Sequence, residues 1–211
     1  MAARVIGVVL LFACLPALCQ SDDLAVGRML VASRDLGDPN FAQTVILLVH
    51  YEEGQNAVGL VVNKRTDVPI SRVFHDLKEA KGRNDPVYIG GPVELNSVMA
   101  LLKSASKPGG SSRVFGDVYL ISDKDLLTQT LGSHAEATMF HTYVGYAGWS
   151  AGQLEHEVEL GAWHIMPADA AIVFHADPDS VWPRLIRRTE SQIARAFLYK
   201  LQALTYTLPL R

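Results

Sequence analysis

Short apolar segments separated by polar, glycine-containing turns recur along most of the chain. Those at residues 29–32, 44–50 and 58–64 are rich in Val, Leu and Ile, which predicts buried β-strands. The last two are joined by a short loop containing Gly54, a pattern typical of an antiparallel hairpin. Further strands are predicted at residues 87–89, 98–102, 114–122, 139–146, 162–166 and 170–175.

Fewer segments have helical spacing, and each of these follows a residue that can cap a first turn. The caps are Ser71, Asp123, Ser150 and Ser180, before helices expected at 72–81, 124–131, 151–160 and 181–188. Thr189 and Gln192 have the spacing of a capping box, which predicts a separate last helix at 190–204. Strands in meander-like order, interrupted by single helices, predict an α+β fold in one domain.

The predicted C-terminal helices have one apolar and one basic face. The apolar positions are Trp182, Leu185, Ile186, Ile193, Phe197 and Leu201. The basic ones are Arg184, Arg187, Arg188, Arg195 and Lys200, against a lone Glu190. This spacing predicts helices that pack their apolar stripe on the core and leave the basic face in water. A homo-oligomer is the alternative if the stripe is wider than one core needs.

The first 19 residues have the organisation of a secretory signal. Arg4 precedes an apolar run at 5–13, Pro16 ends it, and small residues allow cleavage before Gln20. This predicts a signal peptide at 1–19, a single domain at 20–211 and an exported, periplasmic protein with no membrane span after cleavage. A lipoprotein anchored at Cys14 or Cys19 is the alternative, and an uncleaved anchor ranks third.

Composition narrows the class of protein further. Apolar residues make up 49% and charged residues 19%, which predicts a packed globular domain. The formal charge of −3 lacks the basic excess of nucleic-acid-binding surfaces, so an exported chain is not expected to bind nucleic acid. Both cysteines lie in the predicted signal, which excludes disulfides and thiolate chemistry from the mature chain. No cofactor is expected.

A glycine- and aromatic-rich stretch at 145–157 is the first candidate site. Glycines at this density indicate close backbone approach, and large rings need a core or a ligand to cover them. Gly90-Gly91-Pro92 similarly predicts a tight turn where the backbone passes close to another element. Where these segments meet, we expect a ligand- or partner-binding site. Its candidate residues are His50, Asn63, Gly90, Gly91, Tyr146, Trp149, Gln153 and Glu157.

Enzymatic alternatives rank lower. Residues 148–152 read Gly-x-Ser-x-Gly, the nucleophile-elbow pattern, and Asp169 and His175 follow Ser150 in the order of a hydrolase triad. That elbow belongs to parallel sheets, however, and helix capping already explains Ser150. The seven histidines show no metal-binding spacing, and Glu157 has no visible acid–base partner. No catalytic or metal-binding residue is therefore assigned.

Several motifs in sequence order resemble the YqgE/AlgH family. They are Asp38-Pro39-x-Phe41-x-x-Thr44-Val45, Val58-Gly59-Leu60-Val61-Val62-Asn63, Gly90-Gly91-Pro92-Val93, Gly145-Tyr146-Ala147-Gly148-Trp149 and Gly152-Gln153-Leu154-Glu155-x-Glu157. The match extends from about residue 27 to residue 182. The resemblance implies an α+β fold whose bifurcated, largely antiparallel sheet curls into a pseudo-barrel flanked by helices. The family is largely uncharacterised, and the resemblance brings no catalytic residues.

The chain departs from that family in two respects. Members are usually cytoplasmic, whereas this chain begins with an export signal, and Asn56 stands where a glycine is usual. The family label of transcriptional regulator requires cytosolic residence, so it is the second hypothesis. The leading one is a non-enzymatic binding or regulatory protein with a protein or small-molecule partner. A serine hydrolase or metal-dependent enzyme is third.

Overall fold

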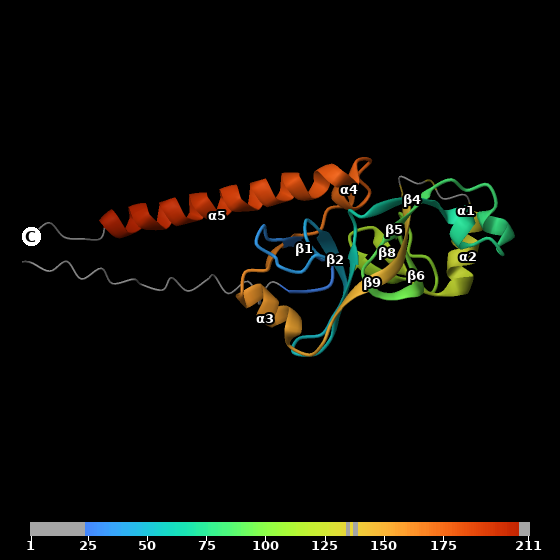
Figure 1. Cartoon of the computed structure of the whole chain (residues 1–211), viewed down its shortest axis with the longest axis horizontal. Coiled ribbons are helices and arrows are strands. Elements are labelled where there is room, and N and C mark those ends of the chain that lie inside the picture. Colours follow the sequence, from blue (N-terminus) through green and yellow to red (C-terminus); the bar gives the residue numbers. More distant parts are fainter. Residues whose placement is uncertain (1–23, 134–135, 137–138, 207–211) are drawn as a thin grey trace, which may run out of the picture.

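A computed structural model describes residues 24–133, 136 and 139–206 of the chain (Figure 1). The predicted signal at 1–19, with its alternative lipidation sites Cys14 and Cys19, lies outside these residues. Among the helices of the described part, none has the length and apolar character that crossing a bilayer requires.

Within the described residues, ten strands form a strongly curled sheet. They are β1 (Arg28–Ala32), β2 (Val45–Tyr51), β3 (Ala57–Val61), β4 (Arg65–Pro69), β5 (Pro86–Ile89), β6 (Val93–Lys103), β7 (Ser112–Phe115), β8 (Val118–Ile121), β9 (Phe140–Trp149) and β10 (Trp163–Pro167). The main path runs β10-β1-β2-β3-β9-β6-β8-β7. Neighbours pair antiparallel except β5 and β9, which are parallel. The largely antiparallel α+β fold predicted from the sequence is confirmed.

The sheet divides along β9. On one side β9 pairs with β6 from Phe140 to Tyr146, while on the other it pairs first with β5 and then with β3. The change of partner falls at Gly145, whose φ of 66° lies in the left-handed region that favours glycine. This fork is the bifurcation implied by the family resemblance, and the curled sheet makes a half-barrel flanked by helices (Figure 1).

Helices and single 3₁₀ turns fill the connections. They are α1 (Ile70–Val73), η2 (Lys78–Ala80), α2 (Lys124–Gly132), α3 (Gln153–Glu159), α4 (Ala170–Val173), η3 (Pro178–Ser180) and α5 (Val181–Tyr206). Asp123 caps α2 as predicted, since its carboxylate accepts a hydrogen bond from the Leu126 backbone N–H at 2.8 Å. The strand preferred for 98–102 is also confirmed, as part of β6.

Three helix predictions were wrong. The helix expected at 72–81 is instead α1, which starts from Pro69, followed by the separate turn η2. Ser150 does not cap α3, because the N-cap is the left-handed Gly152. The tail forms one helix rather than two, since the backbone at Thr189 continues α5 and its hydroxyl donates back to the Leu185 carbonyl.

The strand predictions failed where short apolar runs were ambiguous. The strand expected at 170–175 is replaced by the short helix α4 at Ala170–Val173, because Asp169 caps its first turn by accepting from the Ala171 N–H at 2.9 Å. The single strand expected at 114–122 is the hairpin β7–β8, which turns at Gly116 with a φ of 47°. The polar strand β4 was not predicted, because it lacks an apolar run.

The core has two clusters on either side of the fork. The larger one fills the half-barrel with apolar side chains from β1, β2, β3 and β9 and the start of α5. The smaller one lies under α1 and α2 and includes Ile70, Leu131 and Phe140. The predicted apolar stripe of α5 is buried only at its start, where Trp182, Leu185 and Ile186 lie in the core. Farther along, α5 projects beyond the sheet, and its expected core positions Ile193 and Phe197 are exposed (Figure 1).

Candidate functional site

The loop after β5 crosses the sheet at the fork in β9. Gly90 bridges two strands there: its carbonyl accepts from the Val61 N–H and its N–H donates to the Val144 carbonyl, each at 2.8 Å. A Cβ on Gly90 would lie 2.3 Å from the Gly145 carbonyl oxygen, and one on Gly91 would lie 2.1 Å from the Tyr146 carbonyl carbon. Both glycines are therefore required by the close backbone approach that their sequence pattern indicated.

Strand β6 bulges immediately after this crossing. Val93 pairs with Tyr146 and Val98 with Val144, so residues 94–97 loop outward opposite Gly145. Glu94 has a φ of 46°, which is uncommon for a residue with a side chain. The Glu94 carboxylate interacts with Tyr146, whose pKa is raised first by burial and then by the charge of that carboxylate. Tyr146 thus ties the bulge to β9.

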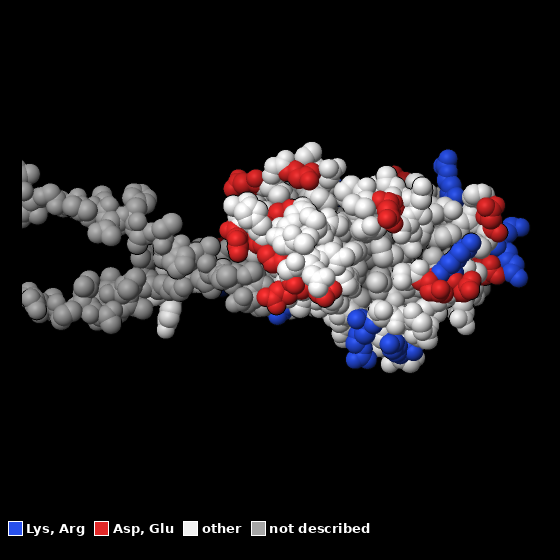
Figure 2. Space-filling model, turned by 90° about the horizontal axis from the view of Figure 1, so that it is seen from below, with Lys and Arg blue, Asp and Glu red and all other residues white. Residues whose placement is uncertain are grey.

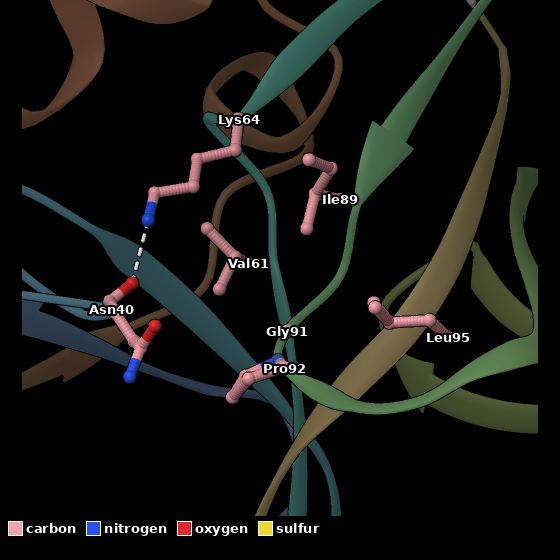
Figure 3. Close-up of a pocket in the computed structure, with 7 residues that line it drawn as sticks. All are labelled: Asn40, Val61, Lys64, Ile89, Gly91, Pro92 and Leu95. Atoms are coloured by element: carbon pink, nitrogen blue, oxygen red, sulfur yellow. Dashed lines mark hydrogen bonds between the residues drawn. The ribbon is translucent and has the colours of Figure 1, made fainter.

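A cavity of about 330 Å³ opens between the crossing, the bulge and a neighbouring loop (Figure 3). We call it the fork pocket; its lining residues are Asn40, Val61, Lys64, Ile89, Gly91, Pro92 and Leu95. Leu95 is 60% exposed and Ile89 39% exposed, so apolar surface faces solvent. The Lys64 ammonium donates to the Asn40 carbonyl at 2.5 Å (Figure 3). The pocket therefore combines an apolar lining with one cationic group.

Asn63 supports the loop that carries Asn40. Its side-chain oxygen accepts from the Val45 N–H at 2.8 Å, and its amide nitrogen donates to the Gln43 carbonyl at 2.9 Å. Gln43 has a φ of 58°. Gln43 and Glu94 are the positive-φ residues other than glycine in the described part, and they lie in the two segments that carry Asn40 and Leu95.

Three other predicted site residues form a separate cluster with Trp163. We call Trp149, Gln153, Glu157 and Trp163 the indole junction. One Glu157 carboxylate oxygen accepts from both indole N–H groups, at 2.9 Å from Trp149 and 2.8 Å from Trp163. The other accepts from the Gln153 amide at 2.8 Å. Both indoles are nearly fully buried. Their N–H groups are satisfied by Glu157, within the cluster.

Phe41 closes the indole junction from the loop before β2. Its ring stacks on Trp149 with centroids 6.3 Å apart and meets Trp163 edge-on at 5.9 Å. Since this loop also carries Asn40, the junction and the fork pocket share one structural support.

Ser150 binds the same cluster rather than a catalytic partner. Its hydroxyl and its backbone N–H both donate to the Gln153 side-chain oxygen, at 3.0 and 3.1 Å. Asp169 caps α4, and His175 contacts the Asp177 backbone. The hydrolase pattern at 148–152 is thus used here to fix a turn.

His50 and the other histidines lie elsewhere. His50 is exposed at the end of β2, where Nε2 is 3.1 Å from the Asn56 side-chain oxygen, and it does not line the fork pocket. In the described part of the chain, no three His, Cys, Asp or Glu residues are grouped closely enough to hold a metal ion. His141 and His175 instead line a second cavity of about 220 Å³ with Arg65 and Tyr88.

Sequence reasoning missed most of the fork-pocket lining. Asn40, Lys64, Ile89 and Leu95 each lie within three residues of a recognised motif, and that proximity was the available signal. It did not reveal that residues 94–97 bulge outward, because that depends on the pairing of β6 with Gly145.

Comparison with known proteins places these features in a family. A family profile described as AlgH-like matches residues 29–194. A UPF0301 protein of Streptomyces avermitilis is 34% identical over 185 residues, covering 82% of this chain and 91% of that relative. One of Azoarcus is 36% identical over 156 residues, covering 72% and 82%.

Solved structures agree with the fold. The AlgH protein from Pseudomonas aeruginosa, solved in solution, is similar with a TM-score of 0.60 and 29% identity, covering 88% of this chain and 94% of that one. A crystal structure from Corynebacterium diphtheriae has a TM-score of 0.65 at 24% identity, covering 82% and 93%, and supports the fold alone.

Proposed function

The chain belongs to the AlgH-like family, and from that premise we propose that it is a non-enzymatic binding protein that captures a partner at the fork pocket. The observation that carries the proposal is the strained, solvent-facing construction of this pocket. Left-handed Glu94 and the close crossing at Gly91 present Leu95 to water instead of burying it. Such backbone costs on the order of 1–3 kcal/mol and is concentrated at ligand sites in proteins.

The pocket lining suggests the chemistry of the partner. Val61, Ile89 and Leu95 offer an apolar surface for a side chain of similar size. The Lys64 ammonium has three N–H donors and gives one to Asn40, which leaves donors for an oxygen on the ligand. We therefore propose that the partner is a protein that inserts an apolar side chain and places a carbonyl or carboxylate oxygen near Lys64.

We also propose that this binding takes place outside the cytoplasm. Support comes from the sequence of residues 1–19, with Arg4, the apolar run at 5–13 and a cleavage position before Gln20.

A DNA-binding regulator is the rival function. On the face seen in Figure 2, the α3 end of the body is mainly acidic, and most basic side chains lie toward the other end, together with further acidic ones. Fractionation with N-terminal sequencing separates the two functions: a mature Gln20 terminus in the exported fraction supports export.

N-acetyl-leucine is a direct probe of the fork pocket, because it joins an isobutyl group to a carboxylate. In a titration followed by amide NMR, we expect millimolar binding with the largest shifts at Gly91, Leu95 and Lys64. N-acetylglycine, which lacks the apolar side chain, is the control and should bind at least about tenfold more weakly, since a buried leucine side chain contributes roughly 1.5–3 kcal/mol.

The Lys64→Gln variant tests the role of the ammonium. It should weaken N-acetyl-leucine without changing the melting temperature, whereas Lys107→Gln, in an exposed loop away from the pocket, should bind like the wild type. Equal binding of both probes, or shifts confined to Trp149 and Gln153, would overturn the proposed site.

A further inference from the structure

The cavity of about 220 Å³ beside β5 lies on the opposite face of that strand from the fork pocket. Consecutive residues of a strand point to opposite faces of the sheet, so Ile89 lines the fork pocket and Tyr88 lines this cavity. Lys64 and Arg65 divide between the two in the same way. We call this second cavity the aromatic cleft. It shares no lining residue with the fork pocket and is a separate surface.

One wall of the aromatic cleft is made of rings from three parts of the chain. Tyr88 stacks on His141 of β9, with ring centroids 4.4 Å apart and an interplanar angle of 22°. Phe174, at the end of α4, tilts against His141 at 5.0 Å. Phe140 also lines the cleft. Aromatic rings pack on one another in offset or edge-on arrangements, so this wall favours a planar aromatic ligand over an aliphatic one of the same size.

The strand register explains why a cation lies beside these rings. Arg65 pairs with Tyr88 across β4 and β5, so the two side chains lie on the same face of the sheet. Burial raises the pKa of the Tyr88 hydroxyl, and the positive charge of Arg65 acts in the opposite direction. The guanidinium is therefore close enough to act on the hydroxyl.

Two polar groups of the aromatic cleft are left for a ligand. Tyr88 is only 3% exposed, yet its hydroxyl has no hydrogen-bond partner in the described part of the chain. Buried polar groups are nearly always bonded, so this exception indicates a partner that enters the cleft. Nor does any described Asp or Glu form an ion pair with Arg65. The acidic residue of the lining, Asp85, pairs instead with Arg83 at 2.6 Å.

We propose that the aromatic cleft binds a small aromatic carboxylate. The carboxylate accepts hydrogen bonds from the Arg65 guanidinium and the Tyr88 hydroxyl. The ring of the ligand packs against Phe174 and His141. A planar guanidinium matches the two oxygens of a carboxylate, and such charge-assisted bonds are stronger than neutral ones. The cleft is smaller than the roughly 300–1,000 Å³ of sites for drug-sized molecules, so a ligand with a single ring fits.

A benzoate titration of the full chain, followed by amide NMR, tests the proposal. We expect a Kd on the order of 1–10 mM, with the largest shifts at Arg65, Tyr88 and Phe174. Benzamide has the same ring without the charge, and cyclohexanecarboxylate has the same charge without the aromatic ring. Each of them should bind at least about threefold more weakly than benzoate.

Two variants separate the contributions of the guanidinium and the hydroxyl. Arg65→Gln should weaken benzoate at least about tenfold, because it removes the charged donors. Arg72→Gln, at an exposed position of α1 outside the cleft, is the matched control and should bind like the wild type. Tyr88→Phe keeps the ring and should bind about threefold more weakly. Its melting temperature should not fall, since the hydroxyl that it removes has no partner to lose.

Several results would overturn the proposal. These are equal benzoate affinities of Arg65→Gln and Arg72→Gln, equal binding of benzoate and cyclohexanecarboxylate, and shifts confined to Leu95 and Lys64, which would place benzoate in the fork pocket. A lower melting temperature of Tyr88→Phe would contradict the unpartnered hydroxyl on which it rests. N-acetyl-leucine should bind Arg65→Gln like the wild type, so the failure of one site is distinguishable from the failure of the other.

Discussion

The indole junction and the fork pocket lie beside the same loop but use their side chains in opposite ways. At the junction, Glu157 accepts three hydrogen bonds from its neighbours and the indoles are buried. At the fork pocket, the Lys64 ammonium donates a hydrogen bond to the Asn40 carbonyl, and Leu95 faces water. Dense glycines and aromatics therefore mark two kinds of structure, and the bonding of the polar groups distinguishes them.

The largest expected effect comes from the backbone crossing that frames the fork pocket. Gly91→Ala should lower the free energy of unfolding by more than about 3 kcal/mol, because its Cβ would overlap the Tyr146 backbone, which cannot move as a side chain does. Gly109→Ala is the control, since nothing lies within 4 Å of its Cβ. Urea denaturation measures both, and similar midpoints would show that the crossing is not tight.

Glu157→Ala should give the next largest loss. It leaves two buried indole N–H groups without an acceptor, which costs about 2–3 kcal/mol in unfolding free energy. Glu159→Ala, at an exposed position of the same helix, should change stability by less than about 0.5 kcal/mol. Tryptophan fluorescence during denaturation follows both variants. If the two are equally stable, the junction is not the structural element described above.

The strands could be predicted because their apolar runs are long and rich in Val, Ile and Leu, as in β2 and β3. Asp123 identified α2 because a cap acts locally. In contrast, residues 170–175 are too short for periodicity to separate strand from helix, and the bond from Ala171 to Asp169 decided for helix.

The candidate site likewise contains residues that could be recognised from the sequence and residues that could not. Gly90 and Gly91 were recognisable because only glycine permits such close contact. Glu157 was recognisable as a polar residue in a distinctive motif, but its second indole partner, Trp163, comes from a different strand. Leu95 could be suspected only from its proximity to the Gly90-Gly91-Pro92-Val93 motif, since its exposure depends on the bulge in β6. Tertiary contacts, which periodicity does not encode, decided which candidates are open.

A smaller effect is expected at the loop between the two regions. Asn63→Ala removes the acceptor for the buried Val45 N–H and the donor to Gln43, so it should cost about 1–2 kcal/mol. It should also weaken N-acetyl-leucine, because the Asn40 wall is no longer held. Asn84→Ala, at an exposed loop position, is the control for both readouts. Unchanged ligand binding in Asn63→Ala would separate this loop from the pocket.

The smallest effect is a pH dependence at the outer edge of α3. Burial, then the hydrogen bond to Glu155, raise the pKa of Tyr51 to about 12 from 10.0. The pKa of Tyr51 is higher in the folded protein than in the unfolded chain. The stability that the protonated Tyr51 hydroxyl contributes is therefore complete below pH 10 and is lost as the pH rises toward 12. Tyr51→Phe should therefore lose less stability than the wild type between pH 10 and 12. Urea titrations at each pH measure the free energy of unfolding. If it falls equally with pH in Tyr51→Phe and in the wild type, this assignment is contradicted.

The central claim is that the fork pocket is open for binding while the indole junction holds the fold together. The most direct measurement pairs the melting temperature with an N-acetyl-leucine titration for Leu95→Asp and Glu157→Ala. We predict that Leu95→Asp abolishes binding at an unchanged melting temperature, whereas Glu157→Ala melts several degrees lower but still binds below its transition. The reverse pattern, in which Glu157→Ala loses the ligand and Leu95→Asp keeps it, would contradict the claim.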